Sequence, residues 1–328
     1  MTRCKVSLSQ AMGNNAEESS IMPQYVLPLA LASLLAIACP AIADDAFYDL
    51  PAPGQRIDVG GYKLHLLCEG SGQPAVILES GLGDWSSHWV SVQHRLRADT
   101  QVCSYDRAGY GWSDPGPRPR DSSRAVTELH TLLDKAGITP PYLLVGHSLG
   151  GINVRLFAST YPDEVSGLLL VDASHPASLP YRRNEDGSTP STAMTTGNQL
   201  MRVAPLESEE MHVPAEIQTA IGNPLLHTKS VVTGRAEFRA LGQSVAALQS
   251  APPMPDLPLI VLSRGLRAWP DGAIGDAHEL AWEAQQHELS KLSTHSTRRI
   301  ALHSGHHIQL DEPDMVADAV RELLREIR

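Results

Sequence analysis

The feature that most constrains the fold is a pair of short apolar runs with no polar residue on either face. They are Tyr-Leu-Leu-Val at 142–145 and Gly-Leu-Leu-Leu-Val at 167–171. A strand with one face in water alternates apolar and polar residues, so these runs indicate strands that are buried on both faces. Sheets of that kind are usually parallel and covered by helices. The two runs therefore predict a parallel sheet between layers of helices.

Further runs bounded by Gly, Pro and Asp extend this pattern along the chain. The expected strands are 56–59, 63–68, 75–79, 101–105, 142–145, 167–171, 259–262 and 298–302, and the expected helices are 89–98, 122–136, 150–161, 277–292 and 313–327. Helices alternate with strands from the third strand onward. This order predicts an α/β fold with a mostly parallel, doubly wound sheet of eight strands.

Residues 176–257 break this rhythm. The segment is rich in Ser, Thr, Met and Pro and has only weak helical patterns, the last at 236–248. So long a connection is usually either functional or disordered, and its place after the sixth strand predicts a helical lid. The expected division is 44–175 for the first part of the core, 176–257 for the lid and 258–328 for the second part of the core.

The N-terminus has a segment apolar enough to suggest a membrane. From Tyr25 to Ala38 there is no charged residue, and Ala41-Ile-Ala43 follows shortly after. A transmembrane helix needs about 20 apolar residues, whereas Ala-x-Ala is the pattern cut by signal peptidase. We expect 1–43 to be a leader and signal peptide, removed after Ala43, which makes the protein secreted or periplasmic with no stable membrane span. The alternative is a permanent N-terminal membrane anchor.

The strongest local motif is Gly-x-Ser-x-Gly at 146–150, centred on Ser148. Four apolar residues precede it and a helix-compatible segment follows it. A strand that runs directly into a helix must turn sharply, and Gly146 and Gly150 relieve the crowding in that turn. The turn lifts the Ser hydroxyl clear of the sheet, at the positive end of the helix. We therefore predict Ser148 as a catalytic nucleophile.

At these residues the chain resembles the α/β-hydrolase superfamily, in particular its small bacterial serine hydrolases with a Gly-His-Ser-Leu-Gly-Gly elbow. The resemblance covers residues 54–328. It implies that the second strand neighbours the fourth, and that a triad occurs in the chain order Ser, acid, His. Ser148, where an Asp would stand in the epoxide hydrolases and haloalkane dehalogenases of this fold, argues against those two activities.

Two glycine-containing loops are expected beside the nucleophile. Glu-Ser-Gly-Leu-Gly-Asp-Trp at 79–85 follows the third strand, where the superfamily usually has His-Gly-x-Gly. An acyl-transfer intermediate needs backbone donors for its oxyanion, and we assign them to the amides of Leu82 and Leu149. The run at 106–113 is similar to one that follows the fourth strand of the superfamily. Its Tyr110 and Trp112, together with Trp85, are candidates for lining the pocket.

The general base is expected in His-Ser-Gly-His-His at 303–307, after the last strand. A loop that leaves this strand can reach Ser148 from the carboxyl edge of the sheet. The Gly-His pair of the superfamily, and the Pro seven residues later, select His306 over His307. His303 is expected to be structural.

The triad acid has three candidates. Many relatives place it shortly after the seventh strand, where this chain has Ala268, with Asp271 and Asp276 further on. Some members take it from the end of the sixth strand, where Asp172 follows three apolar residues. A carboxylate there would be partly buried at the active edge, as needed to orient an imidazole and stabilise its protonated form. We favour Asp172 and keep the other two as alternatives.

Other chemistry is limited. The implied strand order makes Cys68 and Cys103 neighbours, so in an oxidising compartment they are a candidate disulfide, the alternative being two buried thiols. Without an HExxH, CxxC or Rossmann pattern, we expect no cofactor and no metal. The formal net charge of −11, with no long run of Lys or Arg, argues against a nucleic-acid partner.

These residues together predict a secreted serine hydrolase that cleaves a small-molecule carboxylic ester through an acyl-enzyme. Peptidase, lactonase and carbon–carbon hydrolase activities use the same triad and are alternatives. An alternative from another class is a ligand-binding homologue without turnover.

Overall fold

The computed structural model describes residues 52–178 and 224–328, without the side chains of 224–227. The predicted signal peptide at 1–43 and residues 179–223 of the predicted lid lie outside the described residues. Within the two described ranges, none of the helices combines the length and apolar character that crossing a membrane requires.

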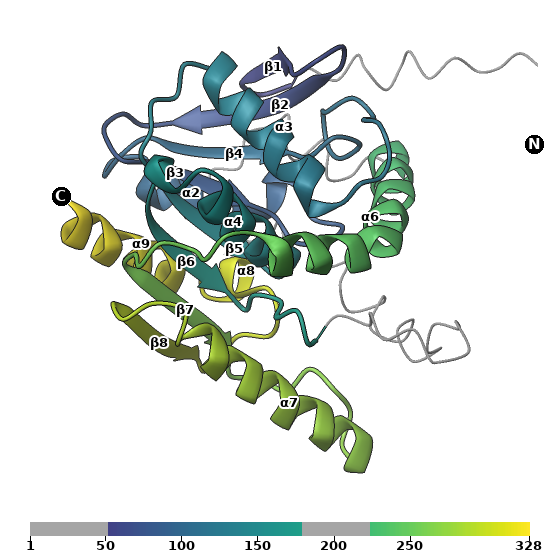
Figure 1. Ribbon diagram of the computed structural model, residues 1–328, viewed down its shortest axis with the longest axis vertical. Coiled ribbons are helices and arrows are strands. Elements are labelled where there is room, and N and C mark those ends of the chain that lie inside the picture. The colour runs from purple at the N-terminus through teal and green to yellow at the C-terminus, as the bar shows by residue number, and fades with distance from the viewer. Residues whose placement is uncertain (1–51, 179–223) are drawn as a thin grey trace, which may run out of the picture. The chain divides into compact units, whose positions relative to one another are not determined.

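Eight strands form one sheet in the order β1-β2-β4-β3-β5-β6-β7-β8 (Figure 1). The pairs β1–β2 and β2–β4 are antiparallel, and the remaining pairs are parallel. The strands are β1 (Gln55–Asp58), β2 (Lys63–Glu69), β3 (Ala75–Glu79), β4 (Val102–Asp106), β5 (Tyr142–His147), β6 (Val165–Val171), β7 (Leu259–Arg264) and β8 (Ser296–Ala301). The mostly parallel eight-stranded sheet is confirmed, as is the contact between β2 and β4.

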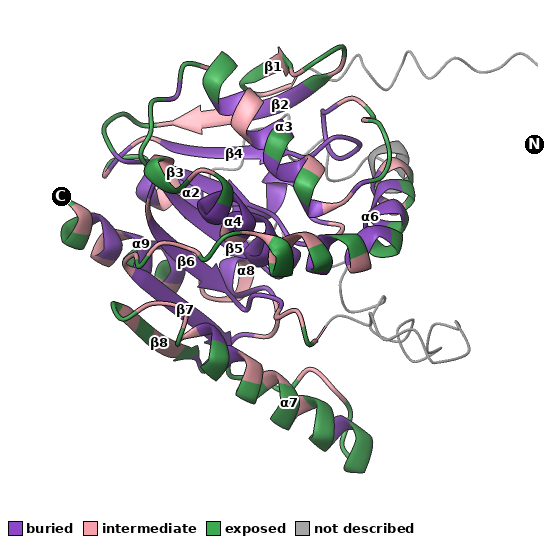
Figure 2. Cartoon of the chain, viewed as in Figure 1, coloured by how far each residue is buried: buried purple, intermediate pink, exposed green. Residues whose placement is uncertain are grey.

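Helices pack on both faces of this sheet. The helical elements are η1 (Ser86–Trp89), α2 (Val90–Leu96), α3 (Ser122–Lys135), α4 (Leu149–Thr160), η2 (Pro162–Glu164), α6 (Pro224–Ser250), α7 (Ala273–Leu289), α8 (Ile308–Asp311) and α9 (Pro313–Ile327). In β3, Ala75 and Ile77 join a core cluster with α3 and α4, whereas Val76 and Leu78 join a second cluster with α2 and α9. Figure 2 shows the central strands buried between these layers, which explains their continuous apolar runs.

The helix α6 differs most from its prediction, because it spans Pro224–Ser250 rather than 236–248. It packs against α3 and α4. Several side chains on its buried face are polar, namely Ser230, Thr233, Glu237 and Ser244. A search for apolar residues at helical spacing therefore recognises only its second half.

Candidate functional site

The motif at 146–150 forms a sharp turn from β5 into α4. Ser148 has a φ of 51° and a ψ of −118°, and Asp172 has a φ of 38°. These two are the residues other than glycine with positive φ in the described part of the chain. Such a backbone conformation is unfavourable for an L-residue and persists where the surrounding structure enforces it, often at functional sites.

Close backbone contacts explain the glycines of this turn. A Cβ atom at Gly146 would lie 2.6 Å from the carbonyl oxygen of Gly150, and one at Gly150 would lie 2.5 Å from that of Glu79. Both distances are too short for a side chain. The carbonyl of Ser148 accepts hydrogen bonds from the amides of Gly151 and Ser174, each at 2.9 Å. The turn is therefore held against both β3 and the end of β6.

The loop after β8 brings His306 to the residue that follows β6. His306 Nδ1 lies 2.6 Å from Asp172 Oδ2. Because a carboxylate only accepts, Nδ1 carries the proton of a neutral His306 and Nε2 keeps its lone pair. This Nε2 is buried and has no hydrogen-bond partner among the described residues. The imidazole is thus oriented from one side, and a basic nitrogen remains available on the other.

Asp172 is fully buried and accepts hydrogen bonds from three residues. Its Oδ1 accepts from the amide of Arg264 at 3.1 Å and from Trp282 Nε1 at 2.9 Å, and its Oδ2 accepts from Arg264 Nη1 at 3.1 Å in addition to His306. Burial alone would raise the pKa of Asp172. The hydrogen bond and charge of His306, the charge of Arg264 and the hydrogen bond of Trp282 outweigh burial and lower this pKa to about 2. The carboxyl group is therefore ionised at neutral pH.

Arg264, like Trp282, is a partner of Asp172 that sequence analysis missed. Its guanidinium carbon lies 4.8 Å from the ring centres of both Trp269 and Trp282. Its Nη2 also donates to Glu279 Oε2 at 3.0 Å. Stacking on two indoles holds the planar guanidinium in one orientation. No local pattern pointed to this role, because Arg264 and Asp172 are far apart in the chain.

The other two acid candidates are held elsewhere. Asp271 and Asp276 pair with Arg267, at 3.2 and 2.5 Å, and their side chains are 98% and 57% exposed. Among the described residues, neither makes an interaction with His306. The structure thus brings Asp172, rather than Asp271 or Asp276, to the imidazole.

Arg107 supports the loop that carries Leu82. Its Nη1 donates to the carbonyl of Ser80 at 2.6 Å and to Glu79 Oε1 at 3.0 Å, and its Nη2 donates to the carbonyl of Gly81 at 2.7 Å. Glu237 of α6 accepts from Arg107 Nε at 2.7 Å and from Nη2 at 3.0 Å. Since Arg107 binds carbonyl groups of this loop, the ion network fixes the backbone that would supply an oxyanion donor. Leu149 is the first residue of α4 and so lies at its positive end.

The aromatic residues predicted to line the pocket are all buried. Tyr110 donates its hydroxyl to Glu237 Oε2 at 2.8 Å and accepts from the amide of Gly83 at 3.2 Å. Trp85 and Trp112 pack edge to face, with ring centres 5.3 Å apart. Tyr110 therefore belongs to the support of the loop at 79–85, and pocket lining by the two Trp residues stays a prediction.

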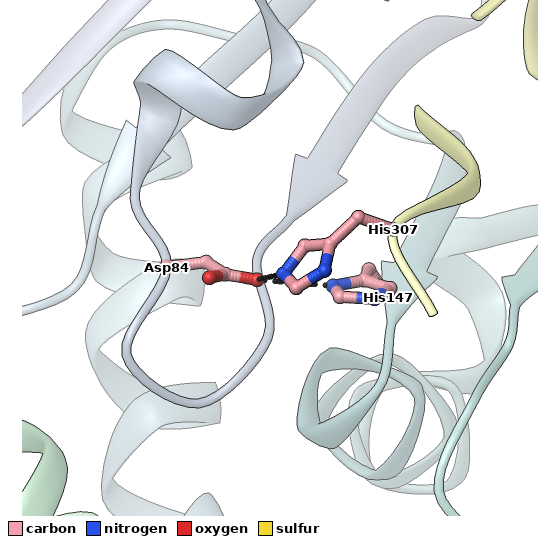
Figure 3. A group of neighbouring side chains, drawn as sticks. All are labelled: Asp84, His147 and His307. Carbon is pink, nitrogen blue, oxygen red and sulfur yellow. Dashed lines mark hydrogen bonds and ion pairs between the residues drawn. The ribbon is translucent and has the colours of Figure 1, made fainter. Parts of the chain in front are cut away.

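A second group of histidines lies beside this site and was also missed. Asp84, His147 and His307 are buried and converge from the loop after β3, the end of β5 and the loop after β8 (Figure 3). Burial lowers the pKa of His147 to about 4, an effect that Asp84 opposes and the charges of His306 and His307 reinforce. Asp84 has a pKa well below its usual range, because His88, His147 and His307 outweigh the effect of burial. Only spatial proximity reveals this group, since its members are spread over the chain.

The two cysteines of the core lie opposite each other in β2 and β4. Cys68 and Cys103 are register partners and form a disulfide. The disulfide therefore links these two antiparallel strands covalently, in the half of the sheet opposite β7 and β8.

Comparisons with known proteins agree with this fold. A family model described as the alpha/beta hydrolase fold matches residues 74–198. The chain is 28% identical over 257 residues to the uncharacterized protein YqjL of Bacillus subtilis, a match that covers 78% of this chain and 85% of YqjL. Several other relatives, including YbdG of the same bacterium, match over 40% or less of their own length.

Solved structures match over most of the chain. The epoxide hydrolase CorEH superimposes with a TM-score of 0.60 at 18% identity, covering 84% of this chain and 99% of its own. An esterase from Thermogutta terrifontis superimposes with a TM-score of 0.57 at 20% identity, covering 83% and 99%. The chain is an α/β-hydrolase-fold protein. Because the activities of these two neighbours differ, the fold alone does not select the reaction of this protein.

Proposed function

We propose that this α/β hydrolase is a serine hydrolase that cleaves carboxylic esters through an acyl-enzyme on Ser148. The observation that carries the proposal is the state of His306. Its Nδ1 is held 2.6 Å from an ionised Asp172, while its Nε2 has no hydrogen-bond partner in the described part of the chain. A general base needs this combination of fixed orientation and an available lone pair.

The residues would share the reaction as follows. His306 Nε2 removes the proton of Ser148 as the hydroxyl oxygen attacks the ester carbonyl, and Asp172 stabilises the imidazolium that results. The amides of Leu82 and Leu149 bind the oxyanion. His306 then protonates the leaving alcohol, which yields the acyl-enzyme. Water repeats these steps to release the acid and restore Ser148.

The nucleophile distinguishes this reaction from that of the structurally similar epoxide hydrolase. The strained residue at the turn is Ser148, with a φ of 51°, whereas the epoxide hydrolases of this fold are expected to have an Asp. An attacking hydroxyl suits acyl transfer and requires a base such as His306 to remove its proton. The alternatives that use the same triad are peptidase, lactonase and carbon–carbon hydrolase activity.

A covalent probe and a series of substrates test the proposal. A fluorophosphonate should label the wild type and fail to label Ser148→Ala. Hydrolysis of p-nitrophenyl esters of increasing chain length should be lost in the same variant. Ser159→Ala, which removes a buried hydroxyl near the end of α4, serves as the matched control and should keep both activities. A wild type that is neither labelled nor active would support the ligand-binding alternative instead.

We also propose that the protein is exported. The apolar segment from Tyr25 to Ala38, followed by Ala41-Ile-Ala43, supports a signal peptide. The disulfide between Cys68 and Cys103 supports an oxidising compartment. Mass spectrometry of the protein from its native host should find a mature N-terminus at Asp44. An intact N-terminus in the membrane fraction would instead favour an N-terminal anchor.

A further inference from the structure

We propose that Asp84, His147 and His307 form a binding site for a zinc ion directly behind the nucleophile turn. Asp84 lies in the loop after β3, His147 ends β5, and His307 follows the predicted base. Figure 3 shows the three side chains pointing toward one another. Two imidazoles and one carboxylate are a common set of protein ligands for zinc, and they leave one tetrahedral position for water.

The distances suit a tetrahedral ion. Asp84 Oδ2 lies 3.1 Å from His147 Nδ1 and 3.4 Å from His307 Nε2. Bonds of 2.0–2.1 Å from zinc place two tetrahedral ligand atoms about 3.3 Å apart. The ligand atoms of all three residues lie within 4.8 Å of one another. Two of the three distances between ligand atoms therefore match those of a tetrahedral ion, and the third, between the two imidazole nitrogens, is at most 4.8 Å.

A hydrogen bond of His147 Nε2 determines that Nδ1 is the nitrogen available to a metal beside Asp84. His147 Nε2 lies 2.9 Å from the backbone carbonyl of His306. A carbonyl can only accept, so Nε2 carries the proton. Nδ1 is then the nitrogen that points toward Asp84 Oδ2, 3.1 Å away. A metal ion that replaces a proton between these two atoms would be bound by both of them. Histidine ligands of metals characteristically donate their other N–H to a carbonyl in this way.

The ring of His307 is held only weakly in the absence of a metal. Its side chain is 1% exposed, and its Nε2 contacts Asp84 Oδ2 at 3.4 Å. Within the described residues neither ring nitrogen meets the geometry of a hydrogen bond. A metal bound between Nε2 and Oδ2 would replace this long contact with two short bonds.

The surroundings complete the site. His88 Nε2 lies 3.3 Å from Asp84 Oδ1, so it contacts the carboxylate oxygen that is not assigned to the metal. Ligating carboxylates usually have such an outer partner. A Cβ atom at Gly81 would lie 2.7 Å from His147 Nδ1 and 2.8 Å from Asp84 Oδ2. Residue 81 must therefore be glycine for these two ligand atoms to approach each other.

The zinc ion would position the reacting groups without contacting the substrate. Each ligand adjoins a residue of the proposed mechanism: His147 precedes Ser148, His307 follows His306, and Asp84 lies two residues after Leu82. One ion would thus tie together the nucleophile turn, the loop of the base and the oxyanion loop. This role rests on the proposed function, whereas binding of the ion does not.

Metal content tests the site without reference to activity. The protein, purified without a histidine tag and stripped with a chelator, is titrated with Zn²⁺ and with Co²⁺. The wild type should bind one equivalent, and Co²⁺ should produce the intense visible absorption of a tetrahedral site. Ser148→Ala should bind equally well. His307→Gln and Asp84→Asn should lose stoichiometric binding, whereas His303→Gln, an exposed histidine of the same loop, should retain it.

The outer partner gives a graded effect. His88→Gln should weaken zinc binding by about 10–100-fold while leaving one site per chain. A wild type that binds well below one equivalent of either ion overturns the proposal, whatever the folding of the variants. Binding that persists in both His307→Gln and Asp84→Asn overturns it as well. Zinc binding by a protein without esterase activity would refute only the proposed function.

Discussion

Two buried polar clusters flank the nucleophile turn and differ in how completely they are paired. In the first, Arg107 donates from all three of its nitrogens to Glu79, Glu237 and the carbonyls of the loop after β3. In the second, both oxygens of Asp172 accept hydrogen bonds, one of them from His306 Nδ1. The Nε2 of His306, however, has no hydrogen-bond partner within the described residues.

This difference in hydrogen bonding distinguishes groups that hold the backbone in place from groups that can react. A charge with every hydrogen-bonding position occupied has no capacity left for a substrate and serves to hold backbone in place. A nitrogen left unpaired next to a saturated carboxylate keeps its lone pair for a proton. The Arg107 cluster should therefore hold backbone in place, whereas the Asp172 cluster has the pairing that the proposed proton transfer requires. The two clusters should respond differently to substitution.

The largest effect is expected at Asp172. Asp172→Asn removes the charge that stabilises the imidazolium and allows the wrong tautomer of His306, so kcat for ester hydrolysis should fall by about 10⁴-fold. Asp271→Asn, at an exposed position beside Arg267, is the matched control and should keep wild-type kcat. Near-normal turnover in Asp172→Asn would show that the acid lies elsewhere.

Arg107 should affect stability most. Arg107→Met leaves Glu79 and Glu237 buried without their cation, which should lower the free energy of unfolding by about 3–5 kcal/mol. Urea denaturation measures this change. Arg97→Met breaks a half-exposed pair with Glu69, at 3.9 Å, and should cost about 1 kcal/mol or less. Equal costs for the two variants would contradict the supporting role of the buried cluster.

A smaller effect is expected at Arg264, which tests how much of the orientation of Asp172 depends on a charge. Arg264→Met keeps the backbone amide that donates to Oδ1 and removes the guanidinium that donates to Oδ2. Loss of one hydrogen bond to a charged group, worth about 1.5–3 kcal/mol, corresponds to a decrease in kcat of about 10–100-fold. Arg298→Met, which breaks an exposed pair with Glu283, should leave kcat unchanged. An unchanged kcat in Arg264→Met would mean that Trp282 and the amide are sufficient to orient Asp172.

The parts of the molecule that sequence analysis predicted are those whose physical cause is local. Burial on both faces requires apolar residues at successive positions, so β5 and β6 are recognisable from their own letters. The turn at Ser148 requires glycine at 146 and 150 because backbone atoms come within 2.6 Å of where a Cβ would be. Asp172 was favoured for a related reason, namely its place directly after a buried strand.

The parts that escaped prediction depend on contacts between distant segments. Arg107 meets Glu237 across 130 residues, and Arg264 meets Asp172 across 92. Within its motif His147 gives no sign of a further role, because its partner Asp84 lies 63 residues away in the chain. Polar residues on the buried face of α6 likewise have partners on other elements, so hydrophobic periodicity could not reveal where that helix begins.

The smallest effect concerns the attachment of α6 to the Arg107 side of the site. Lys229 donates to the carbonyls of Gly111 and Ser113. Burial lowers its pKa to about 8, against the opposing charges of Asp106 and Asp114. Between pH 8 and pH 10.5 the folded lysine loses its proton while the unfolded chain keeps it, so the unfolded state binds more protons and the free energy of unfolding should rise with pH.

Urea denaturation across this pH range measures the effect of Lys229. Lys229→Met should remove this contribution to the slope. Lys135→Met serves as the control, because Lys135 donates to the carbonyl of Asp58 at an exposed position. A slope that is equal in the wild type and in Lys229→Met would mean that α6 does not bury this ammonium group. The helix would then be attached chiefly through Glu237, which would make the Arg107 cluster the main link between α6 and the oxyanion loop.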